Sequence, residues 1–347
     1  MKYFNINTYK FYSLSQQKVY NVFNVIFFAL VIFSASLNAQ EIDTNKPVSN
    51  SHSNLDEGVL LGDLSKLDPL KKPNENFDLL DWSLTLPTDL NKDKKADVVY
   101  EKSLDEGFNL KPFFYTADDG GLVFACPNVG AKTSKNTKYA RTELREMLRR
   151  GNSRIKVKGI TKNNWVFGGT HGSMKAKSGG VGGSLEGTLA VNRVSTTGDE
   201  KKVGRVIIGQ IHATDDEPIR LYYRKLPGNS KGSVYFAHEI NDGDDVWINM
   251  IGSRSHKLSD PVDGIALNEK FSYKISVEDE TLFVTIIREG KPNITKYYDM
   301  KDSGYNAGNQ YMYFKSGVYN QNNEGAKGDY VQATFYHIHN THNGYKF

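Results

Sequence analysis

The segment RTELREM, residues 141 to 147, holds charged side chains that could act together only in one of two secondary structures. As a helix it would be a solvated surface without chemistry, since Glu, Leu, Arg and Met favour helices and Gly151 could form the C-cap. As a strand, its alternation would place Arg141, Glu143 and Arg145 on one face. Two guanidiniums and a carboxylate on one surface would need a functional reason.

Three further segments carry polar residues at strand spacing where a core strand should be apolar. In GQIHA, Gln210 and His212 share a face, and in PIRLYYRKL so do Arg220, Tyr222 and Arg224. In YMYFKSGVYNQ the shared face holds Tyr313, Lys315, Gly317, Tyr319 and Gln321. A sheet face lined with Arg, Lys, Gln, His and Tyr suits a negatively charged, hydroxyl-rich ligand. Each segment alone is equally compatible with a solvent-facing strand, so the interpretation rests on their co-occurrence and on a mid-strand glycine that favours close ligand approach.

These segments lie in a chain patterned for β-structure. From Phe77 onward, short alternating or β-branched runs such as RVIIGQIHA (205–213) and TLFVTIIRE (281–289) are separated by Gly, Asn and Asp. No long stripe of period 3.6 is present. The pattern predicts one all-β domain over residues 75–347, a sandwich or jelly roll, and it favours the strand interpretation of residues 141–147.

Three polar or glycine-rich stretches have compositions that could form further sites. SGGVGGSLEG (178–187) lacks the Lys-Ser/Thr of a phosphate loop and is predicted to be a mobile loop that could flank a cleft. HIHNTH (337–342) is interpreted as a strand end rather than a metal site, because no acidic or cysteine partner lies nearby. NDGDD (241–245) favours a solvated turn over a calcium site.

The first 39 residues predict export. Three lysines and no acids precede a short apolar run from Val25 to Phe33, well below the roughly 20 residues of a membrane span. This pattern predicts a signal peptide cleaved after Ala39 and a secreted or periplasmic protein, with an uncleaved anchor as the alternative. Cys126 is the only cysteine, so neither an internal disulfide nor a lipid anchor is expected.

The charge balance and the segment after the signal peptide point to no particular partner. The formal charge of +4 falls to +1 without residues 1–39, leaving 41 basic against 40 acidic residues. Any affinity for a polyanion must therefore be local, and neither nucleic-acid binding nor stable membrane insertion is expected. Residues 40–74 are polar and rich in Asn and Ser, which predicts a linker or loosely packed arm.

Taken together, three blocks resemble the alginate lyases of polysaccharide lyase family 7. Members show R-(S/T)-E-L-R-E, Q-(I/V)-H and Y-F-K-A-G-x-Y-N-Q in this order. The corresponding blocks here are RTELREM (141–147), QIH (210–212) and YFKSGVYNQ (313–321). Ser316 is the only departure, and FDLLDWSLTLP resembles the start of the family domain. The resemblance covers roughly residues 75–347 and implies a jelly-roll β-sandwich whose concave sheet binds the polymer.

The resemblance also implies a reaction, β-elimination on a uronate polymer. Removing the weakly acidic C5 proton adds charge to a group that is already anionic, and Arg141 and Gln210 match the family residues that stabilise it. His212 and Tyr319 match the acid and base positions. Tyr319 is expected to protonate the departing O4 and to act also as base on mannuronate, whereas His212 is expected to be the base on guluronate. Since the pKa of tyrosine is near 10, a base role requires cationic neighbours such as Arg141 and Lys315.

The remaining polar residues are expected to bind substrate. Those assigned to sugar subsites are Arg145, Arg220, Tyr222, Tyr313 and Lys315. Glu143 either binds sugar hydroxyls or pairs with the flanking arginines. The mechanism needs no metal or other cofactor, and a monomer acting on alginate is expected. Ile211 in the QIH block is associated in the family with guluronate-containing blocks, so we expect a preference for poly(α-L-guluronate) or mixed substrate.

Three other functions remain open from the sequence. A non-catalytic carbohydrate-binding jelly roll would need aromatic platforms but no Tyr–His pair. A glycoside hydrolase would need two carboxylates about 5 to 10 Å apart, whereas Glu143 and Glu146 alternate to opposite faces of the strand. A lyase acting on another uronan, such as glucuronan, would use the same residue types.

Overall fold

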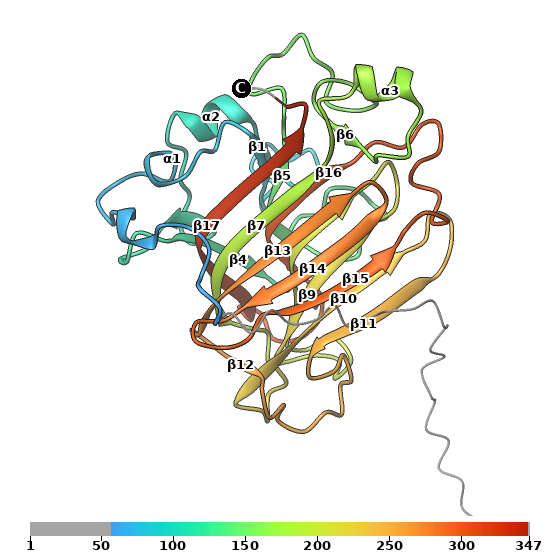
Figure 1. Ribbon diagram of the computed structural model, residues 1–347. Helices are drawn as coiled ribbons and strands as arrows, with labels where there is room; N and C mark the ends of the chain where they lie inside the picture. The colour runs from blue at the N-terminus through green and yellow to red at the C-terminus, as the bar shows by residue number, and fades with distance from the viewer. Residues whose placement is uncertain (1–56, 346–347) are drawn as a thin grey trace, which may run out of the picture. The chain divides into compact units, whose positions relative to one another are not determined.

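The structure, a computed structural model, describes residues 57–345, and these form a sandwich of two β-sheets (Figure 1). One sheet has nine strands and the other has eight. Neighbouring strands are antiparallel except for β6 and β7, which run parallel. The predicted all-β jelly-roll sandwich is confirmed.

In spatial order, the nine-stranded sheet consists of β11 (Asp245–Ile251), β10 (Lys231–Glu239), β9 (Ile219–Arg224), β8 (Arg205–His212), β16 (Tyr313–Asn320), β5 (Arg141–Glu146), β1 (Trp82–Thr85) and β2 (Val98–Val99), with β12 (Ile265–Ala266) beside β10. The eight-stranded sheet consists of β15 (Ile294–Asp299), β14 (Thr281–Ile287), β13 (Lys270–Glu278), β7 (Gly180–Arg193), β17 (Tyr330–Asn343), β4 (Leu122–Pro127) and β3 (Phe114–Thr116), with β6 (Trp165–Val166) beside β7. The helices within residues 57–345 are short: η1 (Leu64–Lys66), α1 (Pro73–Asn76), α2 (Glu101–Asp105) and α3 (Gly172–Lys177).

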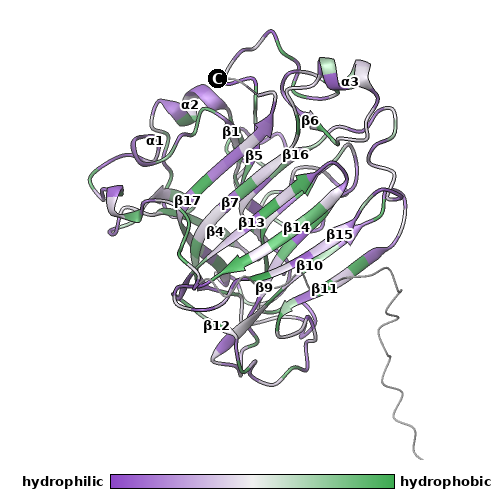
Figure 2. Ribbon diagram, in the orientation of Figure 1, coloured by the Kyte–Doolittle hydropathy of each residue, from purple (hydrophilic) through white to green (hydrophobic). Residues whose placement is uncertain are grey.

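The hydrophobic core lies between the two sheets. Leu144 of β5 and Phe314 and Val318 of β16 belong to the same buried cluster as Phe271 of β13 and Phe335 of β17. Because side chains of a strand alternate, the polar neighbours of these residues point away from the core. In Figure 2, β17 carries both hydrophobic and hydrophilic residues and is hydrophilic toward its C-terminal end. The core therefore fixes which residues of β5 and β16 form the outward face of the nine-stranded sheet.

Residues 141–146 form strand β5, as the strand interpretation predicts. The strand pairs with β1 on one side and with β16 on the other. Leu144 is fully buried, and the Thr142 hydroxyl donates to the Ala125 carbonyl at 2.6 Å. Two hydrogen-bonded neighbours and a buried face outweigh the local helix propensity of these residues.

The prediction of a mobile loop over residues 178–187 is wrong. Most of this segment belongs to β7, which lies between β13 and β17 in the eight-stranded sheet. A Cβ at Gly187 would lie 2.6 Å from the Tyr273 ring, and one at Gly183 would collide with the Thr341 carbonyl. The glycines therefore permit close packing in the sheet interior and do not signal mobility.

Residues 57–74, part of the predicted arm, run beside the eight-stranded sheet. The Leu61 amide donates to the Ser272 hydroxyl at 2.9 Å, and the Thr188 hydroxyl donates to the Leu61 carbonyl at 2.7 Å. The predicted signal peptide and the rest of the arm lie outside the described residues. Between residues 57 and 345, no helix has the length and apolar character needed to cross a bilayer.

Candidate active site

The three blocks of the sequence meet on adjacent central strands, β8, β16 and β5 (Figure 1). Lys315 of β16 lies opposite Gln210 of β8 and Arg145 of β5. One end of this row is extended by the pair His212–Tyr313, and the other by the pair Tyr319–Arg141. Strand pairing thus gathers on one sheet surface the polar residues that the sequence predicted.

Glu143 lies at the centre of this surface and is only 1% exposed. Its carboxylate accepts from Arg141 Nη1 at 3.0 Å and from Lys315 Nζ and Gln210 Nε2 at short range. Burial alone would raise the pKa of Glu143, but the charges of Lys315 and Arg141 outweigh it and hold that pKa below its usual range. Of the two roles considered for Glu143, its contacts are those of pairing, with Arg141 and Lys315 as the cations.

This arrangement fixes the orientation of the Gln210 side-chain amide. An ionised carboxylate only accepts hydrogen bonds, so the group of Gln210 that faces Glu143 must be its NH₂. The carbonyl oxygen Oε1 is buried and has no hydrogen-bond partner within residues 57–345. Oε1 of Gln210 is therefore an acceptor that the protein does not use, whereas one of the two N–H donors of the amide is used by Glu143.

Tyr319 is covered by the guanidinium of Arg141, whose central carbon lies 3.6 Å from the ring centroid. The ring of Tyr139 approaches Tyr319 edge-on at 6.3 Å. Burial raises the pKa of Tyr319, and the positive charge of Arg141 offsets this only in part. The phenol accordingly keeps its proton at neutral pH and is suited to act as an acid.

His212 lies at the other end of the row, stacked on Tyr313 with ring centroids 5.1 Å apart. Its Nδ1 donates to the Ala213 carbonyl at 2.8 Å, which leaves Nε2 as the nitrogen without a proton in the neutral ring. Burial, with the nearby charge of Lys315, lowers the pKa of His212 to about 3. The imidazole is therefore neutral at physiological pH and can accept a proton through Nε2.

Lys315 completes the charged row between these two residues. Burial, together with repulsion from Arg141, lowers the pKa of Lys315 to about 8. Its ammonium group is nevertheless largely protonated at neutral pH and contacts Glu143.

Arg145 shares the face but directs its guanidinium toward the protein. Its Nη1 donates to Glu146 O at 2.7 Å and to the sulfur of Met147, and its Nη2 donates to Val157 O and to Asn164 Oδ1. These bonds account for all four Nη hydrogens. The guanidinium carbon also lies 4.0 Å from the Tyr313 ring centroid. The contacts of Arg145 are thus those of a residue that positions Tyr313 and the loop after β5.

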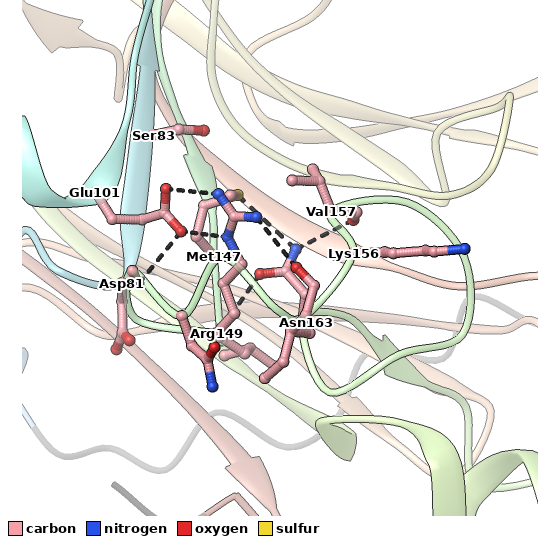
Figure 3. Close-up of polar contacts among 12 residues, drawn as sticks. Asp81, Ser83, Glu101, Met147, Arg149, Lys156, Val157 and Asn163 are labelled. Atoms are coloured by element: carbon pink, nitrogen blue, oxygen red, sulfur yellow. Dashed lines mark hydrogen bonds and ion pairs between the residues drawn. The ribbon is translucent and has the colours of Figure 1, made fainter.

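The loop after β5 is itself held by a partly buried ion pair (Figure 3). Arg149 donates from Nε and Nη2 to the two carboxylate oxygens of Glu101, at 2.5 and 3.2 Å. In the same view, Asn163 donates to the Val157 carbonyl at 3.1 Å. The loop that receives Arg145 is therefore anchored at several points.

Arg220 and Tyr222 lie on β9, beside Gln210, and both are already engaged within the protein. Arg220 contacts the carboxylates of Glu217, Glu239 and Asp245. Tyr222 is only 2% exposed and stacks on Tyr235 at 5.0 Å between ring centroids. These two predicted subsite residues thus form the packed border of the site.

The sequence analysis did not predict that three carboxylates, those of Glu217, Glu239 and Asp245, lie around Arg220 beside the site. Glu217 Oε1 lies 3.4 Å from His212 Nε2, so this acidic group reaches the candidate base. Burial and a hydrogen bond with Glu217 raise the pKa of Glu239 to about 7. The three-residue spacing of Glu217 and Arg220 could have indicated that these two residues pair. No such local signal exists for Glu239 and Asp245, because they lie on the separate strands β10 and β11.

Gly317 occurs at mid-strand for a different reason from ligand approach. Its φ is +135°, and a Cβ there would lie 2.7 Å from the Thr142 carbonyl and 2.9 Å from the Glu143 Cα. The glycine therefore permits close approach of β16 to β5. Within residues 57–345, no cluster of three or more His, Cys, Asp or Glu side chains is arranged to hold a metal ion. The expectation of a metal-independent reaction remains a prediction.

Comparison with known proteins finds relatives over most of the chain. Residues 77–342 match the family described as "Alginate lyase". An alginate lyase of Klebsiella pneumoniae is 52% identical over 279 residues, which cover 78% of this chain and 91% of that protein. The crystal structure of the alginate lyase from Klebsiella pneumoniae aligns with a TM-score of 0.78 and covers 80% of this chain and 100% of its own.

A more distant relative supports the same assignment. Alginate lyase A1-II′, a member of polysaccharide lyase family 7, is 26% identical, with a TM-score of 0.56 and coverage of 79% of this chain and 99% of its own. A variant of it with a histidine changed to asparagine and a tyrosine to phenylalanine was solved in complex with the substrate GGMG. The chain described here belongs to the alginate lyases of polysaccharide lyase family 7.

Proposed function

We propose that this lyase cleaves alginate by β-elimination at the 4-O-glycosidic bond, with Arg141, Gln210, His212 and Tyr319 as the catalytic residues. The base removes the C5 proton, the electron pair forms the C4=C5 double bond, and the C4–O4 bond breaks. Tyr319 then gives its proton to O4. The products are a new reducing end and a 4,5-unsaturated uronate at the new non-reducing end.

One observation carries this proposal: the site pairs a neutral imidazole with a protonated phenol on adjacent strands. His212 has a bare Nε2 and a pKa of about 3, whereas burial keeps the proton on Tyr319. An elimination needs one group that accepts a proton and one that gives a proton at the same pH. The geometry supports His212 as base and Tyr319 as acid when the C5 hydrogen and the leaving group lie on opposite sides, as in guluronate.

The carboxylate of the substrate is held by Arg141 in this proposal. The Nε of Arg141 is buried and lacks a hydrogen-bond partner among the described residues, so this donor is not committed within the protein. Because the NH₂ of Gln210 is turned toward Glu143, the free Oε1 of Gln210 is assigned to accept a hydrogen bond from a substrate hydroxyl. Lys315 contributes positive charge as negative charge develops on the carboxylate.

A preference for guluronate-containing blocks is proposed on two grounds. The first is the resemblance of the QIH block, and the second is the complex of a relative with the substrate GGMG. Ile211 itself is fully buried in the core and cannot touch a sugar. Any influence of Ile211 on specificity acts through the packing of β8 beneath Gln210 and His212. Export through the predicted signal peptide is proposed with the same function.

The test is to mix the protein with alginate, with and without a chelator, and to follow the ultraviolet absorbance of the unsaturated uronate. We expect a rise that survives chelation and that falls by about 10³-fold or more in Tyr319→Phe, since the acid is removed. His212→Asn should lose more activity on polyguluronate than on polymannuronate. New reducing ends without absorbance would indicate a hydrolase, and alginate binding without turnover would indicate a carbohydrate-binding domain; either result would refute the proposal.

A further inference from the structure

Two hollows beside strand β17 share Tyr330 and Gln332 as lining residues, and the first is also lined by Lys225 and Pro227 from the loop after β9. Their volumes are about 380 and 370 Å³. Strand β17 carries both shared residues and passes between β4 and β7, as Figure 1 shows. The two hollows therefore flank one tyrosine, and we call them together the Tyr330 groove.

The Tyr330 groove faces away from the candidate active site. Val331 and Ala333 of β17 are fully buried in the core, so the alternating residues Tyr330 and Gln332 point outward from the eight-stranded sheet. The candidate active site lies on the outward face of the other sheet, because Phe314 of its strand β16 packs in the same core. A ligand in the groove would therefore not contact the catalytic residues.

The charged residues that line the first hollow are both cations, Arg193 and Lys225. The Arg193 guanidinium lies 4.5 Å from the Tyr330 ring centroid, and its side chain is 46% exposed. Asp329 is 3.5 Å from Arg193, but it is buried, and its Oδ2 accepts from the amides of Thr196 and Thr197. Arg193 is therefore paired with Asp329 Oδ1 on one side, while its half-exposed guanidinium keeps an accessible surface that an external anion could contact.

The second hollow adds aromatic surface to this charge. Phe113 and Tyr115 line it, and Lys111 Nζ lies 5.0 Å from the Tyr115 ring centroid. The second hollow is also lined by Ala125 and Pro127 of β4, which lie directly opposite Gln332 and Tyr330. Their short side chains leave space beside the aromatic rings. Tyrosine rings offer flat apolar faces to sugar rings, while Lys and Arg bind carboxylates. The combination fits a saccharide that carries negative charge.

We propose that the Tyr330 groove is a second binding site for anionic uronate saccharide, remote from the catalytic residues, which holds the polymer while it is cleaved. The identity of the ligand rests on the proposed function, because the polymer substrate is the anionic saccharide that this enzyme meets. A site of this kind raises the local concentration of long chains at the enzyme. A short oligomer that fills only the catalytic subsites gains nothing from it.

The test compares Arg193→Gln/Tyr330→Ala with the unaltered full chain and with Lys301→Gln, which removes an exposed cation elsewhere. We expect KM for long alginate to rise about fivefold in the double variant. This is the size of effect expected when the charge-assisted contact of Arg193 and the adjacent ring of Tyr330 are lost. The kcat of the double variant on the polymer should not change, and neither should its kcat and KM on a short uronate oligomer. An unchanged KM on the polymer, or equal losses on both substrates, would overturn the proposal.

A binding measurement separates this proposal from the catalytic one. Native electrophoresis through a gel containing alginate reports retention without requiring turnover, and a gel containing a neutral glucan tests the role of charge. Retention by alginate should fall in Arg193→Gln/Tyr330→Ala and also in the milder Arg193→Gln, with unchanged melting temperatures. Equal retention of all variants by alginate would refute binding at the Tyr330 groove. The same loss of retention in the neutral-glucan gel as in the alginate gel would also refute it. Failure of the proposed elimination would appear instead as missing ultraviolet product.

Discussion

Glu143 makes it possible for two cations to lie beside each other in a largely buried site. In the free enzyme, the positive charges of Arg141 and Lys315 repel each other in a site of low dielectric constant. The buried carboxylate of Glu143 lies between them and offsets this repulsion. The same carboxylate orients the amide of Gln210. Glu143 is therefore a positioning residue whose influence reaches three strands.

Replacing this carboxylate should damage both activity and stability. In Glu143→Gln we expect kcat/KM to fall about 100-fold and the free energy of unfolding to fall by about 3 kcal/mol. The reason is that the buried cations Arg141 and Lys315 lose their shared carboxylate partner. Kinetics and denaturant unfolding measure the two effects. Glu186→Gln, which alters a half-buried carboxylate paired with Lys274 on the other sheet, is the control and should keep full activity. Full activity in Glu143→Gln would contradict the positioning role.

The pKa values of Lys315 and His212 predict the shape of the pH profile. Lys315 loses its proton as pH rises through about 8, so kcat/KM should decline there. His212, with a pKa of about 3, stays unprotonated well below its usual 6.5, so the profile should show no acid limb near pH 6.5 from this residue. Lys315→Arg keeps its charge at higher pH and should move the basic limb upward by more than one unit. A basic limb that stays in place in Lys315→Arg would assign it to another group.

At the scale of single strands, the close approach of β16 to β5 depends on Gly317. Gly317→Ala should lower the free energy of unfolding by about 2 to 3 kcal/mol, because its φ is unfavourable for L-residues and the Cβ meets the backbone of β5. Denaturant unfolding measures the loss. Gly172→Ala, where a Cβ meets nothing within 4 Å, is the matched control and should be neutral. A neutral Gly317→Ala would show that the strands can separate without cost.

Strand periodicity predicted much of the site because its residues obey simple alternation. Arg141 and Glu143, and likewise Lys315 and Tyr319, reach one surface as their spacing requires, and antiparallel pairing of β5 with β16 then aligns them. Periodicity could not predict which donors remain for a ligand. The two Nη2 hydrogens of Arg145 are used by the Val157 carbonyl and the Asn164 side-chain amide, which lie 12 and 19 residues away in sequence.

Other features depend on contacts that a local pattern does not contain. The register of β8 shifts between Ile207 and Gly209 where it pairs with β9, so the face of each side chain changes relative to strict alternation. The glycine-rich start of β7 suggested a loop because glycine has low strand propensity. Its true cause is the close packing of Tyr273 and of strand β17, which no local rule could reveal.

Across the whole molecule, charge is nearly balanced but is unevenly distributed at the site. On the β5–β16 side, Arg141 and Lys315 outnumber Glu143, whereas on the β9–β11 side three carboxylates surround Arg220. A polyanion should therefore be attracted to one side and repelled from the other. The net charge of +4 for the chain conceals this local difference.

Removing one acid from the negative side should improve binding of the polymer. In Asp245→Asn we expect KM for long alginate to fall about threefold at low ionic strength, with kcat little changed. The difference should vanish at 1 M salt, where the screening length is about 3 Å. Asp105→Asn, an exposed acid on α2, is the control. A KM that rises or stays constant in Asp245→Asn would show that the acidic group does not repel substrate.

Strand β5 has a second buried carboxylate on its inward face, and this limits how the site could be transplanted. Glu146 accepts from the Phe314 amide, from Asn340 Nδ2 and from His342 Nε2, at 3.1, 2.7 and 2.7 Å. The strand that carries Arg141 is thus joined to β16 and to the end of β17. Grafting the catalytic residues onto another sandwich would require moving β8, β16, β5 and the end of β17 together, since any one of these strands alone would lack the partners that set its register.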